Sequence, residues 1–416
     1  MARLSEVLRE RGYVYQHSSE TLEEITDREK RTVYLGIDPS ADSLHAGNLV
    51  GLLVLRRFLE DGHKVILLTG GGTGMIGDPG GKSEERNLLD EDTVGRNAKA
   101  VAAQIRKVFG GGDFIEENNA KWLSRLNLLE FLRDVGKHFT VNAMIKKDIV
   151  RDRLEQESPI SFTEFSYALL QGYDFLHLNE EYSCDVQVGG SDQWSNILAG
   201  VEFIRKREGR TVYALTWPLV MNKATGKKFG KSEQGAVWLD AGRTSIFDFY
   251  QFWFNTEDEN AAQYLRLFTL LDEVEIEAAL ELQRRDPAER HAQRLLAREV
   301  TALVHGESAT NVAERVSLAL FGDGNLAALD KASIEALRAA APSLTVQARA
   351  PLLDVLVRSG LAASKREARQ LISDGAVMLG GTLIGDETSE IEDDAFVKGL
   401  ALLRRGKRNV RILVLE

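Results

Sequence analysis

The stretch TVYLGIDPSADSLHAGNLVGLLVLRRFLED, residues 32–61, predicts a strand that passes through a short turn into a helix. Its TVYLGI segment is an apolar run typical of a buried strand, and NLVGLLVLRRFLED repeats apolar side chains at helical spacing. The first turn of a helix carries unpaired backbone N–H groups and a partial positive charge, which together suit an anion. His45, Gly47 and Asn48 therefore predict an anion site at this helix start, with a plain turn and a polar cap as the alternative.

The same alternation recurs through the first half of the chain. The runs KVILLTG (64–70) and CDVQVGG (184–190) predict two further strands, and helices are predicted at 93–109 and 128–139. Strands that alternate with helices and end in glycine-rich turns indicate an α/β fold with a parallel sheet. Ligands of such sheets bind at the carboxyl ends of the strands.

The second half of the chain has a different pattern. From about residue 245 to residue 340 the periodicity is helical, which predicts a helical domain. A new pattern begins near Pro351, where two short helices precede strands that are separated by glycines. We expect a small α+β module there.

Composition limits the class of protein. With 416 residues, of which 44% are hydrophobic and 28% charged, the chain can form two or three ordinary globular domains. A single cysteine, Cys184, excludes an intramolecular disulfide and fits a reducing cytoplasm. The first residues are charged and amphipathic, unlike a signal peptide, and no apolar run reaches the roughly 18 residues of a membrane span. A net charge of −11 argues against a protein that coats nucleic acid, so RNA contacts must come from local basic patches.

A glycine-rich loop, GGGTGMIGDPGGKSEE, follows the second predicted strand. Its glycines have the spacing of a dinucleotide-binding loop, so an NAD-dependent oxidoreductase is an alternative. That fingerprint needs a helix that starts within the loop, whereas Asp78-Pro79 interrupts it. The acids that follow, Glu91 and Asp92, begin a predicted helix instead of ending a second strand. We favour a loop that carries Thr73 and Asp78 across a pocket.

Polar side chains share one face of the helix predicted in SPISFTEFSYALLQGYDFLHL. Ser161 and Glu164 have the spacing of a capping box, which starts a helix. Tyr167, Gln171 and Asp174 follow at steps of four and three residues, so they lie on one face. This stripe of a phenol, an amide and a carboxylate predicts a site for a polar ligand; a solvated stripe is the alternative.

The strand predicted at 184–190 leads into another polar turn. Gln187 lies near the end of this strand, and two glycines precede Ser191-Asp192-Gln193 at a predicted helix start. Asp192 is either a simple helix cap or a carboxylate that binds a ribose or an ammonium group.

The segment NKATGKKFGKSEQGAVWL, residues 222–239, brings four lysines together: Lys223, Lys227, Lys228 and Lys231. The glycines between them predict a flexible loop. Because the segment lies at the end of the α/β region, the loop can reach back over a nucleotide site. A solvated lysine-rich loop is the alternative.

Taken together, these segments resemble the class I aminoacyl-tRNA synthetases, and among them the bacterial-type tyrosyl-tRNA synthetases. HAGN stands where the family has HIGH, and KFGKS stands where it has KMSKS. GIDPSADSLH, GDPGGKSEER, FLRDVGKHF, FTEFSYALLQGYDF and VGGSDQWSNI follow in the family's order and spacing. The closing module resembles an S4-type RNA-binding domain. Two positions depart from the family pattern: Asn48 replaces the second histidine of HIGH, and Phe229-Gly230 replace Met-Ser.

The resemblance implies a Rossmann-type catalytic domain over residues 1–222, followed by the KFGKS loop and a helical anticodon-binding domain over 223–325. It also implies a linker over 326–350, a flexibly joined S4-like domain over 351–416, and a homodimer.

The S4-like segment holds ten basic and ten acidic side chains, and six of the acids lie between residues 386 and 394. This segregation predicts that folding gathers the basic side chains on one phosphate-binding face and turns the acids away. The basic side chains are Arg358, Lys365, Arg366, Arg369, Lys398, Arg404, Arg405, Lys407, Arg408 and Arg411.

The resemblance also assigns roles to single residues. Tyr34 and Asp174 would hold the phenol hydroxyl of a tyrosine substrate, and its ammonium group would contact Asp78, Tyr167 and Gln171. Residues expected near the amino acid or the ribose of ATP are Asp38, Gln187, Asp192 and Gln193. Catalytic residues expected around the ATP phosphates are Ser40, His45, Asn48, Lys228 and Lys231. The ATP site would further include Gly36, Gly47, Gly190 and Ser232.

The implied reaction is the ATP-dependent activation of L-tyrosine to tyrosyl-adenylate, followed by transfer of tyrosine to the 3′ end of tRNA(Tyr) in the cytoplasm. ATP with Mg²⁺ is the co-substrate, without a tightly bound cofactor, a protein metal site or a membrane partner. Catalysis then requires charge stabilisation around the transferring phosphorus and no enzyme nucleophile. Besides the oxidoreductase, which Asp78-Pro79 argues against, two alternatives remain, an RNA-binding protein without catalysis and a tryptophanyl-tRNA synthetase. Tyr34 and Asp174 argue against the second.

Overall fold

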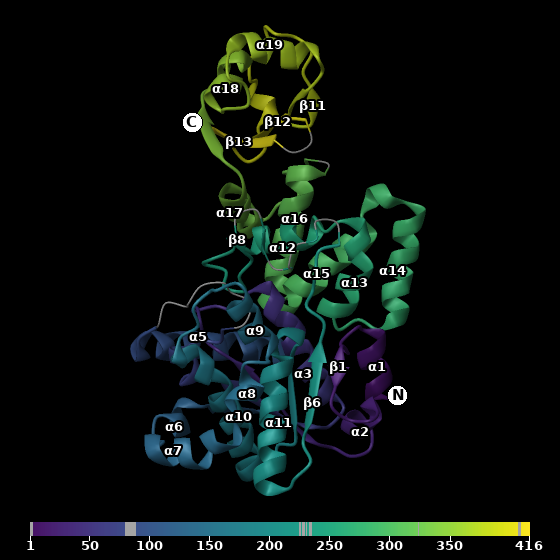
Figure 1. The fold of residues 1–416 in the computed structure, drawn as a ribbon. Helices are drawn as coiled ribbons and strands as arrows, with labels where there is room; N and C mark the ends of the chain where they lie inside the picture. The colour runs from purple at the N-terminus through teal and green to yellow at the C-terminus, as the bar shows by residue number, and fades with distance from the viewer. Residues whose placement is uncertain are drawn as a thin grey trace. The chain divides into compact units, whose positions relative to one another are not determined.

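The computed structural model describes residues 3–79, 89–223, 226, 229, 231–232, 235–322, 324–406 and 409–416. The chain forms two compact units (Figure 1), one from residues 1–243 and 256–296 and the other from residues 244–255 and 297–416. In these described ranges, no helix has the length and apolar character that crossing a membrane requires.

The described part of the first unit contains a six-stranded sheet in the order β1–β6–β5–β2–β3–β4. All neighbours pair in parallel except β1, which pairs antiparallel with β6. Because the chain moves from β2 to β3 on one side and later to β5 on the other, the strand order reverses beside β2. Open α/β sheets bind ligands at such a reversal. The strands are β1 (Gln16–His17), β2 (Thr32–Ile37), β3 (Lys64–Thr69), β4 (Ile115–Asn118), β5 (Val186–Gly190) and β6 (Tyr213–Trp217).

Helices cover both faces of this sheet. Leu35 of β2 faces α3, while the neighbouring Tyr34 faces α10 and packs on Phe175 with ring centroids 5.3 Å apart. Helices α10 and α11 run side by side (Figure 1) and approach closely at Gly172 and Gly200. The helices of this unit include α1 (Leu4–Glu10), α2 (Leu22–Thr26), α3 (Leu49–Glu60), α4 (Thr73–Ile76), α5 (Glu91–Phe109), α6 (Ala120–Leu123), α7 (Leu128–Asp134), α8 (Val141–Met144), α9 (Asp148–Glu155), α10 (Phe162–Tyr182), α11 (Trp194–Glu208), α13 (Asp258–Phe268) and α14 (Glu273–Arg285).

The helices predicted between about residues 245 and 340 are divided between the units, because α13 and α14 belong to the first. The second unit contains α12, α16 and α17 of that segment and a five-stranded sheet in the order β11–β10–β12–β13–β9. The prediction of two short helices followed by strands is confirmed, because α18 and α19 precede β10 and β11 and pack on this sheet. The elements are α12 (Ile246–Phe254), α15 (His291–His305, which begins in the first unit), α16 (Glu307–Phe321), α17 (Lys331–Ala340), β9 (Ser343–Val346), α18 (Leu352–Arg358), α19 (Lys365–Ser373), β10 (Val377–Leu379), β11 (Thr382–Leu383), β12 (Leu400–Arg405) and β13 (Asn409–Leu415).

The segment expected as a linker, residues 326–350, contributes regular structure to this unit. It contains α17 and β9, and β9 pairs in parallel with β13. Leu402 and Ile412 of the sheet share a buried core with Leu320 of α16 and Leu337 of α17. The terminal sheet is therefore joined to the preceding helices by a continuous core.

Candidate active site

A cavity of about 830 Å³ opens in the first unit at the carboxyl ends of β2, β3 and β5. Its walls contain every predicted site residue whose side chain the structure describes: Tyr34, Gly36, Asp38, Ser40, His45, Gly47, Asn48, Asp78, Tyr167, Gln171, Asp174, Gln187, Gly190, Asp192 and Gln193. Lys228 lies outside the described residues, and Lys231 and Ser232 are described only as the backbone of strand β7 (Lys231–Ser232). The chain thus gathers residues from four distant segments around one space.

The start of the helix after β2 is capped by its own side chains. The Gly47 N–H donates to His45 Nδ1 at 3.1 Å, and the His45 N–H donates to Asn48 Oδ1 at 3.0 Å. A short 3₁₀ turn, η1 (Ala46–Asn48), then leads into α3. An imidazole whose Nδ1 accepts a hydrogen bond carries its proton on Nε2 when neutral. When neutral, His45 therefore carries its proton on Nε2, and this N–H and the Asn48 NH₂ group are the side-chain donor groups at this helix start.

Asp174 lies at the closed end of the cavity and is held by two donors. Asn119 Nδ2 donates to Oδ2 at 2.8 Å, and Trp122 Nε1 donates to Oδ1 at 2.7 Å. Burial raises the pKa of Asp174 to about 7, against the opposing effect of these two hydrogen bonds. The buried Tyr34 hydroxyl has no hydrogen-bond partner among the described residues, and burial raises the pKa of this phenol well above its usual value. This end of the cavity can therefore accept a hydroxyl group that both donates and accepts.

A chain of hydrogen bonds joins this closed end to the opposite wall. Asn119 Nδ2 also donates to Thr73 Oγ1 at 2.9 Å, and the Thr73 hydroxyl donates to Asp38 Oδ1 at 2.6 Å. The Tyr167 hydroxyl donates to Asp38 Oδ2 at 2.8 Å. Gly70 is required beside this network, because an added Cβ would lie 1.9 Å from Asp38 Oδ1. The network fixes Asp38 and Tyr167 before any ligand enters.

A third carboxylate, Asp78, faces the cavity from the glycine-rich loop. Gln193 Nε2 donates to Asp78 Oδ2 at 2.6 Å, and Asn196 Nδ2 donates to Gln193 Oε1 at 3.4 Å. Lys147 brings a positive charge nearby; burial lowers its pKa to about 8, while the charge of Asp78 acts in the opposite direction. Asp78 thus contributes a carboxylate to this wall of the cavity, with the Lys147 ammonium group nearby.

The middle of the lysine-rich segment is attached to helix α13 through Phe229. The Phe229 ring lies 4.9 Å from that of Tyr264 and 4.7 Å from that of Phe268, measured between centroids. Its backbone N–H donates to the Val220 carbonyl at 2.9 Å. Phe229, the first departure from the family's Met-Ser pair, therefore serves as an aromatic anchor that also lines the cavity.

The two residues that donate to Asp174, Asn119 and Trp122, were not predicted from the sequence. Both follow strand β4, which the sequence analysis did not predict. The only signal available was NNAKWL, where an amide and an indole stand three residues apart at a turn. Nothing local in that segment indicates a partner in α10.

The prediction of a purely basic face on the terminal module needs correction. Arg404 is buried and donates to the carbonyls of Ala319 and Gly322 at 2.7 and 3.2 Å. Arg369 forms an ion pair with Glu387 at 3.3 Å, so the acidic loop is not turned away from all basic side chains. Further basic side chains with printed internal partners are Arg358, Lys365, Lys398, Arg405 and Arg411. Arg366 is exposed, and Lys407 and Arg408 lie outside the described residues.

The chain matches known protein families over nearly its whole length. A sequence model described as tRNA synthetases class I (W and Y) matches residues 26–322. A second model, described as the Tyrosine--tRNA ligase SYY-like C-terminal domain, matches residues 333–413.

Individual relatives agree with these matches. Two proteins named Tyrosine--tRNA ligase, from Roseiflexus castenholzii and Staphylococcus haemolyticus, are 47% and 46% identical to the chain. The alignments cover 99% of this chain and of the first relative, and 97% of this chain and of the second. A solved structure, the C-terminally truncated mitochondrial tyrosyl-tRNA synthetase of Aspergillus nidulans, is 30% identical with a TM-score of 0.69. This likeness covers 76% of this chain and 93% of the solved one.

Proposed function

The chain belongs to the class I tRNA synthetases of the tryptophan and tyrosine family, and on this premise we propose that it is a tyrosine--tRNA ligase. It activates L-tyrosine with ATP to tyrosyl-adenylate and transfers the tyrosine to the 3′ end of tRNA(Tyr) for protein biosynthesis. The observation that carries the proposal is the closed end of the cavity, where the Tyr34 hydroxyl, which has no hydrogen-bond partner among the described residues, and the Asp174 carboxylate are both buried.

The chemistry of this end favours tyrosine over tryptophan. A phenol hydroxyl can donate to Asp174 and accept from Tyr34 at the same time. An indole N–H can only donate, so it would leave the Tyr34 hydroxyl buried without an acceptor, and an unpaired buried donor costs about 1–3 kcal/mol. The match of the terminal segment to a tyrosine--tRNA ligase domain supports the same choice.

The remaining walls fit the other groups of tyrosine and ATP. Asp78, Tyr167 and Gln171 bind the ammonium group of tyrosine, at the end of the cavity where Asp78 contributes a carboxylate. Residues that position the amino acid and the ribose are Asp38, Gln187, Asp192 and Gln193. Glycines that let the nucleotide approach the backbone are Gly36, Gly47 and Gly190.

Adenylate formation requires donors around the phosphates. The tyrosine carboxylate attacks the α-phosphorus of ATP and pyrophosphate leaves, so negative charge shifts toward the leaving oxygens. His45 Nε2–H and the Asn48 NH₂ group supply fixed donors at a helix start, where backbone N–H groups also favour an anion. Further groups proposed to act on the phosphates are Ser40, Lys228, Lys231 and Ser232.

Asn48 can replace the family's second histidine because its amide group supplies both a hydrogen-bond acceptor and a hydrogen-bond donor. Oδ1 accepts the His45 N–H, as the Nδ1 atom of a histidine would, and Nδ2 is left to donate to phosphate.

We propose that Mg²⁺ enters as part of the ATP substrate. Within the described ranges, no three histidine, cysteine, aspartate or glutamate side chains converge as a metal site would require. Mg²⁺ keeps most of its ligands as water and phosphate oxygens, which suits delivery with ATP. The ion supplies charge neutralisation on the phosphates.

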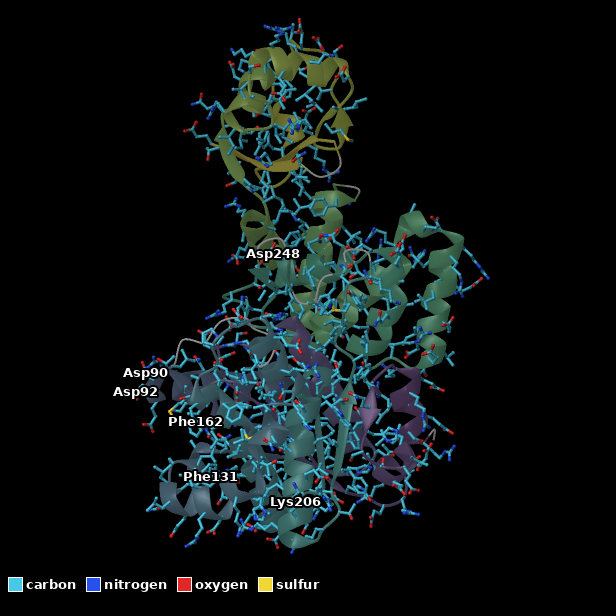
Figure 2. All side chains as sticks on the ribbon, viewed as in Figure 1. Asp90, Asp92, Phe131, Phe162, Lys206 and Asp248 are labelled. Atoms are coloured by element: carbon cyan, nitrogen blue, oxygen red, sulfur yellow. The ribbon has the colours of Figure 1, made fainter. Side chains whose placement is uncertain are left out.

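We also propose that the protein is a homodimer through the surface of α7, α8, α9 and the start of α10. Apolar side chains are exposed there in unusual density, and Phe162 retains 76% of its accessible surface. Figure 2 labels Phe131 and Phe162 on the same side of this unit. The exposed apolar residues are Leu128, Leu129, Leu132, Val141, Ile145, Leu154 and Phe162. A second copy of the chain would cover them.

We propose a cytoplasmic location, where translation takes place and where Cys184 stays reduced. The function itself is tested by incubating the purified chain with labelled tyrosine, ATP and bacterial tRNA. The proposal expects labelled tRNA that releases its tyrosine in mild alkali, as an ester does. Label that stays with the protein, or none on tRNA at saturating substrates, would contradict it.

A further inference from the structure

We propose that Trp238 is a positioning residue for His45, which it holds with Nε2–H aimed at the ATP phosphates. The inference rests on the phosphate-binding role proposed for His45 and adds a residue from outside the family-like motifs. It rests on the backbone pairing of residues 237–239, which follow the lysines, with residues 44–46.

The backbones of the two segments run antiparallel and are bonded on both sides of His45. The Ala46 N–H donates to the Val237 carbonyl at 2.8 Å, and the Leu239 N–H donates to the Leu44 carbonyl at 2.8 Å. His45 and Trp238 are therefore directly opposite partners in an isolated bridge. Side chains of such partners lie on the same face and contact each other.

The two rings meet edge to face within the cavity wall. Their centroids are 6.4 Å apart and their planes meet at 66°. Both residues line the cavity. An edge-to-face contact restricts rotation of the imidazole about its bond to the backbone, because the ring quadrupole favours one relative orientation.

The imidazole is also held from its own helix. The Gly47 N–H donates to Nδ1, and an added Cβ at Gly47 would lie only 3.0 Å from Nδ1 and from Cε1. The hydrogen bond to Nδ1 selects the His45 tautomer that carries its proton on Nε2, and the Trp238 indole limits the orientation of the imidazole plane. One hydrogen bond of this kind contributes about 0.5–1.5 kcal/mol net, so by itself it leaves the ring able to swing away.

Trp238 is in turn fixed by neighbours outside the cavity. The Arg243 guanidinium lies 4.6 Å from the centroid of the indole, and Arg243 forms an ion pair with Asp42. The Asp240 N–H donates to Ser43 Oγ at 3.1 Å. Residues 42–46 and 237–243 therefore form a clasp that we call the His45 clasp, defined by these two segments.

The clasp also adjoins the lysine-rich loop. Strand β8 (Gly235–Ala236) pairs with β7 and leads directly into Val237 of the clasp. The backbone of Lys231 is thus connected to the His45 clasp through the pairing of β7 with β8. A misplacement of about 1 Å in a catalytic donor can cost roughly a hundredfold in rate.

The test measures the single-turnover rate of tyrosyl-adenylate formation at saturating tyrosine and Mg·ATP. Trp238→Leu should slow this step by roughly tenfold to a hundredfold, whereas Trp238→Phe, which keeps a ring edge, should stay within about threefold of wild type. The dissociation constant of tyrosine without ATP should stay unchanged in both variants. Weaker tyrosine binding, or an equal loss in both variants, would show a structural role and overturn the proposal.

A double-substitution cycle with His45→Gln separates this inference from the proposed function. If Trp238 acts through His45, then Trp238→Leu should slow a His45→Gln enzyme by less than about twofold. The same loss in both backgrounds would overturn the inference while leaving His45 in its role. A His45→Gln enzyme with the wild-type rate would instead remove His45 from the reaction and contradict the proposed function at this site.

The Arg243→Gln variant should have a rate of adenylate formation between those of wild type and Trp238→Leu. It should slow adenylate formation less than Trp238→Leu, because the indole keeps its backbone pairing with His45. The matched control is Arg205→Gln, which removes an exposed ion pair with Glu202 on α11 and should leave the rate unchanged. An Arg243→Gln loss that exceeds that of Trp238→Leu would contradict the clasp.

Discussion

At the scale of single residues, the cavity is marked by buried polar atoms that lack partners. Within the described ranges, the Tyr34 hydroxyl and the Oε1 atoms of Gln171 and Gln187 have none. Buried polar atoms are nearly always hydrogen-bonded in native proteins, so exceptions that share one cavity indicate that a ligand completes them. Asp174 differs from these residues, because its two oxygens are each already fixed by one donor.

Replacing Tyr34 by Phe should lower the preference for tyrosine over phenylalanine by roughly tenfold. In the proposed site the hydroxyl contacts the substrate before and during the reaction, so its removal should raise KM for tyrosine more than it lowers kcat. Steady-state ATP–pyrophosphate exchange with each amino acid measures both quantities. An unchanged preference would remove Tyr34 from the amino acid site.

The raised pKa of Asp174 predicts a pH-dependent selectivity. Burial lifts this pKa from 3.8 to about 7, so the carboxylate is ionised above that pH and protonated below it. A neutral carboxyl accepts a phenol proton less strongly. The ratio of kcat/KM for tyrosine to that for phenylalanine should therefore fall between pH 8 and pH 6, a range chosen about one unit on either side of this pKa. Phenylalanine carries no phenol and serves as the internal control; a ratio that does not change with pH would contradict the prediction.

At the scale of secondary-structure elements, the sequence predicts well those helices and strands that are long, buried and regular in their local pattern. The predicted strand at 32–37 coincides with β2, and the capping box at Ser161 and Glu164 begins α10. Strand β4 is four residues long and mostly polar, and only its pairing with β3 makes it a strand. That pairing is a tertiary property, which is why Asn119 and Trp122 could not be assigned to the site in advance.

The prediction of a basic face on the terminal module was wrong for a related reason. Sequence spacing cannot tell a basic side chain that faces solvent from one that donates to a buried carbonyl. Arg404, in the middle of a basic run, donates to the end of α16, and Lys398 donates to the Ala327 and Leu329 carbonyls. These donors tie the terminal sheet to the helices before it.

Arg404→Met should loosen the terminal sheet without affecting the cavity. The change leaves the Ala319 and Gly322 carbonyls without their charged donor, which costs about 1.5–3 kcal/mol. Amide hydrogen exchange over residues 400–415 should become faster, while tyrosine-dependent pyrophosphate exchange stays at the wild-type rate. The control is Arg366→Met, on the exposed face of α19, which should change neither quantity. Unaltered protection in the Arg404 variant would refute the structural role.

At the scale of the whole molecule, we propose that the two steps of the reaction use different units. The residues that line the cavity all belong to the first unit, so the proposed site of tyrosine activation lies within that unit. We propose that the second unit contributes to tRNA binding, which the match of residues 333–413 to a synthetase C-terminal domain supports. Because β9 and α17 share a core with the terminal sheet, single substitutions test this role more cleanly than removal of residues 351–416.

The proposed homodimer predicts that Phe162→Asp shifts the protein toward a monomer. A charge in the apolar surface of α7–α10 would be desolvated by the second copy, which opposes association. Sedimentation velocity over a range of protein concentrations measures the shift. Val274→Asp is the matched control, because Val274 is equally exposed at 78% but lies on α14, outside that surface. Identical sedimentation of the Phe162 variant and wild type would contradict this interface.

The central claim, that the cavity activates tyrosine, is tested most directly by ATP–pyrophosphate exchange scanned across the common amino acids one at a time. The buried pair of Tyr34 and Asp174 predicts rapid exchange with tyrosine alone, since only a phenol satisfies both groups. Exchange that depends on tryptophan, with no response to tyrosine, would contradict it.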